Sequence, residues 1–209
     1  YVMISRTMIG RLLIIGPVGG MASWLIWGGM LGVSDFGDHA AMVAAISANA
    51  DVTKWIMGLA IFFFLLLVAG LTGLRNTMTG GPGSDYAAMG VLFVVMAMSV
   101  GLAEVALTMG AAEIGASGNG SLAMTMYLAG NAIGAISTAA MMLGMAVLGL
   151  GIYMQKNFHV AIAGLLMVGG IAGLSISLYD YGNQLLTIGY LGMSIGVASI
   201  GVSIVRSSD

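Results

Sequence analysis

The chain has 209 residues, of which 59% are hydrophobic and only 7% are charged, and its formal net charge is −2 at pH 7. Soluble domains carry about 25% charged residues, so this composition predicts a protein surrounded mostly by lipid. The scattered basic residues and the absence of cysteine exclude a nucleic-acid-binding surface, disulfides, thiolate metal sites and cysteine nucleophiles. We therefore expect an all-α protein, a polytopic membrane helix bundle that forms a single domain over residues 1–209.

The first predicted transmembrane span covers residues 12–33 and follows Arg6 and Arg11. A run of this length exceeds the apolar core of a typical signal peptide, so we expect a retained helix. The polar connection 34–54 comes next, and Asp38 can cap a short helix within it. Such a helix would lie in the membrane interface, and an ordinary folded loop is the alternative.

Five further apolar stretches complete a bundle of six predicted spans. They cover residues 55–74, 86–108, 121–152, 160–178 and 185–205. The connection 109–120 is rich in glycine and other small residues, so we expect a loop there. The stretch 121–152 contains no charged side chain and exceeds the length needed to cross a bilayer, so we predict that it is the central helix.

Small residues recur at alternating spacings of three and four in the fourth and sixth spans. This spacing places them on one face of each helix, where small side chains let a neighbouring backbone approach closely in lipid. The pattern does not determine whether the two faces pack on each other. The glycines to which we assign helix packing are Gly130, Gly134, Gly144, Gly189, Gly192 and Gly196.

The distribution of basic residues predicts the orientation of the chain. With six spans, one side of the membrane receives both termini and the basic residues Arg6, Arg11, Arg75, Lys156 and Arg206. The other side receives a single basic residue, Lys54, together with most of the acidic residues. The positive-inside rule then places both termini in the cytoplasm, and we expect the prokaryotic plasma (inner) membrane.

Glu104 is the first candidate contact for a ligand or ion. It lies within the third span, about one turn before the predicted outer end. An ionisable group in lipid is costly unless it is paired or hydrated, so it is a functional candidate by default. The alternative is that Glu104 marks a hydrated helix end.

Three further candidates lie on the predicted outer side or near it. Asn131, in the fourth span, either joins two helices by hydrogen bonds or contacts a ligand, and Tyr127 shares its helix face. Asp180 occupies the last outer turn, where acidic loops that converge would attract a cation or an amine. Acidic loops that merely keep the surface soluble are the alternative.

No catalytic motif, metal site or cofactor site is predicted, and we lean toward a protein that is not an enzyme. A retinal protein would need a lysine well inside a span, whereas Lys54 and Lys156 lie at a boundary and in a turn. The 19 methionines are spread over nearly every span, which favours flexible core filling over copper binding.

The layout resembles certain uncharacterised six-helix bacterial integral membrane proteins, known only as domains of unknown function. The resemblance rests on the turn at Arg75 and on the segment GIYMQKNFHVAIAGLLMVGGIAGL. It implies a six-helix fold and brings no activity or site residue with it.

Two functions from different classes follow from these observations. The first is a non-enzymatic accessory or structural subunit that packs against other membrane protein chains or copies of itself, in contact with lipid and with no nucleic-acid partner. The alternative is a transporter or channel for a small solute or cation, with an acidic outer vestibule and with Glu104 and Asn131 along the path.

Overall fold

The computed structural model describes residues 4–33 and 35–207, and over these residues it contains seven α-helices and no strand. The prediction of an all-α chain with six long apolar helices is confirmed. The helices long and apolar enough to cross a membrane are α1 (Arg6–Leu31), α3 (Ala50–Thr77), α4 (Ser84–Ala116), α5 (Gly120–Gln155), α6 (Val160–Tyr179) and α7 (Leu185–Arg206). The remaining helix of the described residues, α2 (His39–Ala48), is short.

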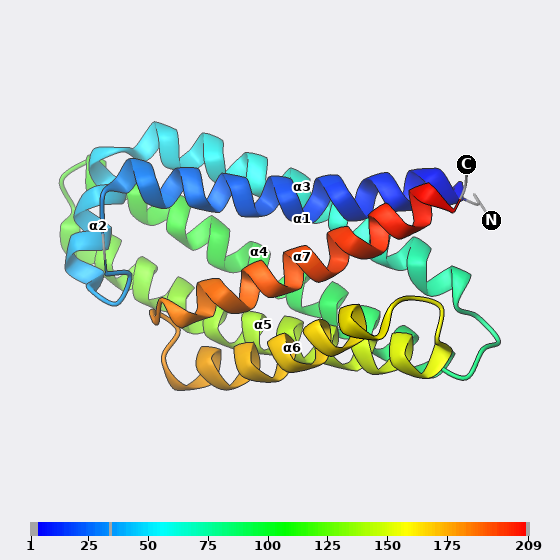
Figure 1. Cartoon of the computed structure of the whole chain (residues 1–209). Coiled ribbons are helices and arrows are strands. Elements are labelled where there is room, and N and C mark those ends of the chain that lie inside the picture. The colour runs from blue at the N-terminus through cyan, green and yellow to red at the C-terminus, as the bar shows by residue number, and fades with distance from the viewer. Residues whose placement is uncertain (1–3, 34, 208–209) are drawn as a thin grey trace.

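The six long helices form a closed ring. Each packs against two neighbours, in the order α1, α3, α4, α5, α6, α7 and back to α1. Helix α2 lies across one end of this ring, against α4 and α5 and in contact with α1 and α3 (Figure 1). Helix α5 is the longest and has the most buried apolar stretch, but it is a member of the ring and does not run through its centre.

Large apolar side chains cover the outside of the ring. Leu25, Leu59, Leu92, Val168 and Ile195, on five different helices, are each about half exposed or more. Soluble proteins rarely leave such a continuous apolar surface in water. The outer surface of the ring is therefore suited to the hydrocarbon of a bilayer.

The end of the ring opposite α2 is filled by side chains. Helix α1 begins and α7 ends there, and a Cβ atom on Gly201 would lie 2.5 Å from the Gly10 carbonyl oxygen (Figure 1). The interior at this end is closed by buried apolar side chains from four helices, which we call the plug. The plug consists of Leu13, Leu71, Met145, Leu148 and Ile200.

The predicted loop at residues 109–120 is wrong. Helix α4 continues to Ala116, so only residues 117–119 connect it to α5. Ala111 and Ala112 are fully buried in an apolar cluster with Met42 and Ile46 of α2. The small residues that indicated a loop are instead the contact surface of a helix, because a small side chain allows α2 to approach closely.

Side chains cap the first turns of α1 and α2. Helix α1 begins six residues before the predicted span, at Arg6, where the Ser5 hydroxyl accepts a hydrogen bond of 3.2 Å from the backbone N–H of Met8. At the start of α2, an Asp38 carboxylate oxygen accepts a 3.0 Å bond from the backbone N–H of Ala41. Both caps satisfy N–H groups that a helix leaves free in its first turn.

The two small-residue faces do not pack on each other. Gly130, Gly134 and Gly144 of α5 face α4, and a Cβ atom on Gly144 would lie 2.7 Å from the Gly90 carbonyl oxygen. The small-residue face of α7 turns to α6: the nearest atoms to Cβ atoms on Gly189, Gly192 and Gly196 belong to Gly173, Leu165 and Leu166, respectively. Both faces are thus filled by helices of the same chain.

Candidate functional site

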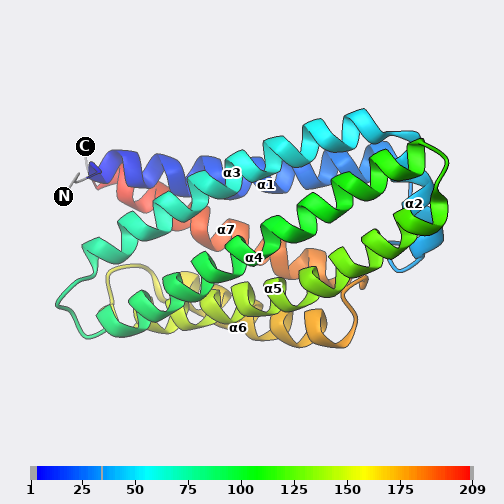
Figure 2. The same ribbon diagram turned by 180° about the vertical axis from the view of Figure 1, so that it is seen from behind.

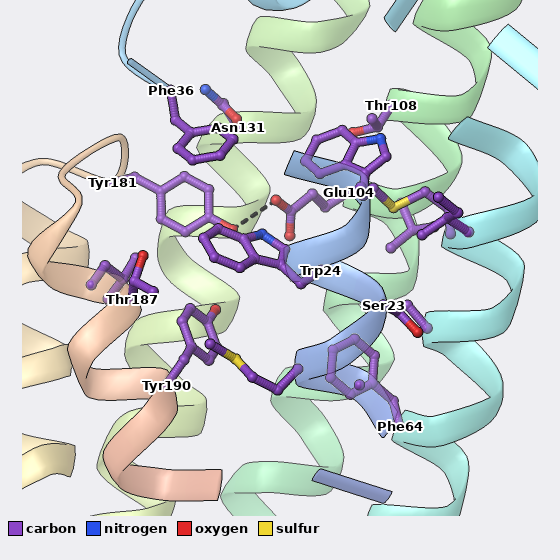
Figure 3. Close-up of a pocket in the computed structure, with 18 of the residues that line it drawn as sticks. Ser23, Trp24, Phe36, Phe64, Glu104, Thr108, Asn131, Tyr181, Thr187 and Tyr190 are labelled. Carbon is purple, nitrogen blue, oxygen red and sulfur yellow. Dashed lines mark hydrogen bonds between the residues drawn. The ribbon is translucent and has the colours of Figure 1, made fainter. Parts of the chain in front are cut away.

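A cavity of about 220 Å³ lies inside the ring, between the plug and the end that α2 covers. Its walls come from α1, α3, α4, α5 and α7, and Met42 of α2 and the turn 181–183 contribute at the covered end. Figure 3 shows how aromatic rings surround it. The aromatic residues that line the cavity are Trp24, Trp27, Phe36, Phe64, Tyr127, Tyr181 and Tyr190.

Glu104 is the acidic residue of this cavity. No other acidic residue and no basic residue is present among the described residues that line it. Because α4 continues to Ala116, Glu104 lies about three turns before the end of the helix, deeper than the sequence placed it. Glu104 therefore does not lie at the end of its helix, as the alternative interpretation required.

The Glu104 carboxylate is held by a residue far away in the sequence. The Tyr181 hydroxyl donates a 2.7 Å hydrogen bond to Glu104 Oε1, and the two residues are 77 positions apart (Figure 3). Burial raises the pKa of the Tyr181 hydroxyl, so this group stays protonated and remains a donor. The bond connects α4 to the turn between α6 and α7.

One of the predicted packing glycines, Gly134, also makes room for the Glu104 side chain. A Cβ atom on Gly134 would collide with the Glu104 carboxyl group, whereas one on Gly130 would lie 3.4 Å from the backbone carbonyl oxygen of Glu104, an ordinary contact. The small-residue face of α5 therefore does more than bring two helices together. It gives the carboxylate the space to lie against α5.

Asn131 and Tyr127 line the same cavity as Glu104, one helical turn apart on α5. Asn131 Nδ2 lies 3.5 Å from Nδ1 of His39, at the start of α2. The His39 ring also meets the Tyr127 ring edge to face, with 5.8 Å between the ring centroids. Asn131 thus faces the cavity and contacts a neighbouring helix, so the two interpretations left open by the sequence are compatible.

Asp180 does not line the cavity. It is exposed, and it accepts a 3.2 Å hydrogen bond from Asn183, which does line the cavity. Other acidic residues of this end have local partners as well. Lys54 lies 3.2 Å from Asp51 and 2.8 Å from Glu113.

Several residues that define the site were not selected from the sequence. Tyr190 of α7 shares a 2.7 Å hydrogen bond with Thr138 of α5, and Trp24, Phe64 and Tyr181 complete the wall around Glu104. Aromatic residues near span ends are common in membrane proteins, so their presence alone gives no indication of a site. In the described part of the chain, no three histidine or acidic side chains gather closely enough to hold a metal ion.

A ring of six apolar helices around an aromatic cavity with one acidic residue is the architecture of a multi-pass helical membrane protein with an internal cavity. Comparisons of the chain with protein-family models, curated proteins and solved structures find no match. The resemblance to uncharacterised six-helix bacterial membrane proteins stays a prediction.

Proposed function

We propose that this chain is an integral protein of the prokaryotic inner membrane that binds a small organic cation in the ring cavity and transports it. The observation that carries the proposal is Glu104, a carboxylate in an aromatic cavity that no described basic residue lines. A charge in low-dielectric surroundings is stabilised by an opposite charge, and aromatic faces attract cations. A bound ammonium group would satisfy both.

The chemistry of the cavity favours an organic cation over a metal ion. Calcium and magnesium need six or more oxygen ligands or retain much of their water. Here a single carboxylate is surrounded mainly by Trp24, Trp27 and other apolar or aromatic side chains. Such surroundings suit a weakly hydrated ammonium group with methyl or methylene substituents.

The position of the plug supports a carrier rather than an open channel. The cavity lies toward α2, while Leu13, Leu71 and Leu148 close the ring on the other side. We infer that this arrangement faces outward and that the plug must part during transport. Helices α1 and α7 cross where Gly10 and Gly201 meet, and they diverge toward the cavity (Figure 1).

The accessory-subunit hypothesis has less support. It was motivated by the small-residue faces, and those faces are occupied by α4 and α6 of the same chain. They therefore leave no close-packing surface for a partner helix. Packing in a larger complex stays a prediction without an observation in its favour.

The orientation can be tested with reporters at the chain ends. Arg6, Arg75, Lys156 and Arg206 lie at the starts or ends of helices at the plug end, so we expect this end to face the cytoplasm. A green fluorescent protein fused to either terminus is expected to fluoresce, and alkaline phosphatase inserted at 117–119 is expected to be active. Termini on opposite sides of the membrane would contradict the proposal.

Binding can be measured through the tryptophans. Trp24 and Trp27 line the cavity, whereas Trp55 is 82% exposed and lies outside it. Choline is expected to change the tryptophan emission of the purified protein saturably, while its uncharged isostere 3,3-dimethyl-1-butanol is expected to have little effect. Trp55→Phe should retain the response, and choline uptake into proteoliposomes should saturate.

A further inference from the structure

A second cavity of about 160 Å³ lies between α3 and α4. These helices are joined at one end by the turn 78–83 and at the other by the Lys54–Glu113 ion pair of 2.8 Å. Figure 2 shows the two helices close together near α2 and diverging toward the turn 78–83. The cavity lies along the middle of both helices, at residues 61–68 and 95–105, and extends to Ser137, Thr138 and Met141 of α5.

The walls of the second cavity are mostly apolar, and some of them face outward. Leu65 of α3 is 59% exposed and Leu102 of α4 is 44% exposed, on the outer surface of the ring. Val68 and Met98 lie deeper. The cavity is therefore an apolar slot that starts at the lipid-facing side of the bundle.

The inner end of the slot meets the first cavity at the carboxylate. Phe64, Glu104, Val105 and Tyr190 line both cavities. If the charged group of a ligand pairs with Glu104, the rest of the ligand can extend either into the first cavity or into the apolar slot. The slot leads between α3 and α4 to the outer surface of the ring, at the exposed Leu65 and Leu102.

We propose that the ligand is a single-chain amphiphile, with its ammonium group at Glu104 and its alkyl chain in the slot between α3 and α4. This inference rests on the proposed function and narrows its substrate class. The carboxylate gives charge complementarity for the head, and Leu65, Val68 and Met98 give apolar contacts for the chain. Such a ligand enters sideways from the membrane, where amphiphilic amines accumulate.

The test uses a homologous series with a constant head group. The affinities of tetramethylammonium and of ethyl-, butyl- and hexyltrimethylammonium are measured by tryptophan fluorescence with the full chain in nanodiscs. We expect affinity to rise about threefold for each added methylene group, since each buried methylene adds apolar contact. A flat series would overturn the inference while leaving the proposed function intact.

Filling the slot should remove the chain-length dependence. Gly101 lines the second cavity but not the first, and a Cβ atom there would lie 3.6 Å from Ser137 Oγ, an ordinary contact. In Gly101→Leu, the hexyl compound is expected to bind no better than tetramethylammonium, whose own affinity stays unchanged. Leu65→Trp narrows the slot from its outer side and provides a second variant.

The matched control is Gly58→Leu on α3. Gly58 lines neither cavity, and a Cβ atom there meets nothing within 4 Å. This variant should retain the full chain-length series. If hexyltrimethylammonium still binds more tightly than tetramethylammonium in both slot variants, its alkyl chain binds elsewhere and the inference is wrong. If no member of the series binds the unaltered protein, the proposed function fails as well.

Discussion

Choline binding is expected to weaken about ten- to a hundredfold in Glu104→Gln, and choline uptake should fall to the background of empty liposomes. A hydrogen-bonded interaction with a charged group contributes about 1.5–3 kcal/mol, and every 1.4 kcal/mol is a factor of ten in affinity. Glutamine keeps the volume of Glu104 and an acceptor for the Tyr181 hydroxyl, so the shape of the cavity should persist. The tryptophan titration and the uptake assay measure the two effects.

Glu113→Gln is the matched control for this experiment. It is the same substitution on the same helix, and Glu113 lies outside both cavities in an exposed ion pair with Lys54. Exposed ion pairs contribute little to stability, so binding and uptake should stay as in the unaltered protein. Equal losses in the two variants, or an undiminished affinity in Glu104→Gln, would rule out Glu104 as the cation site.

Gly144→Leu is expected to lower the melting temperature of the purified protein by roughly 5–10 °C. A Cβ atom at this position would lie 2.7 Å from the Gly90 carbonyl oxygen and 3.0 Å from the Val94 amide nitrogen. Backbone atoms cannot move aside as a flexible side chain can, so α4 and α5 must separate. Overpacking of this kind costs about 1–3 kcal/mol, and for a chain of this size each kcal/mol shifts the melting temperature by about 2–4 °C.

The control for this prediction is Gly164→Leu on α6. A Cβ atom on Gly164 meets nothing within 4 Å, so the new side chain has room on the outside of the bundle. Its melting temperature should match that of the unaltered protein in the same detergent. A stable Gly144→Leu variant would show that α4 and α5 do not approach as closely as Gly90 and Gly144 indicate.

Composition and hydropathy were sufficient for the six long helices, and Asp38 as a capping residue suggested α2, with an ordinary folded loop as the alternative. The same local rules failed at residues 109–120. There Ala111 and Ala112 belong to a helix whose small residues are buried against α2. Composition alone does not distinguish a flexible loop from a closely packed helix, because both favour small side chains.

The candidate site was predicted in part. Glu104 was selected because an ionisable group in lipid needs a partner, Asn131 because a buried amide needs hydrogen-bond partners, and Tyr127 because it shares the helix face of Asn131. All three line one cavity. Asp180 was selected with them, yet it lies outside the cavity and bonds to Asn183, which does line it. Sequence proximity to a turn did not indicate which of its side chains points inward.

The sequence by itself determined the six long apolar helices that suit a bilayer and which helix faces are small, because these properties depend on residues close together in the chain. Only the tertiary structure decided the order of helices around the ring, the partners of the glycine faces and the contact of Tyr181 with Glu104. Lipid is as apolar as the helices themselves, so helix neighbours are chosen by the fit of their surfaces and not by hydrophobicity. That fit joins residues far apart in the sequence.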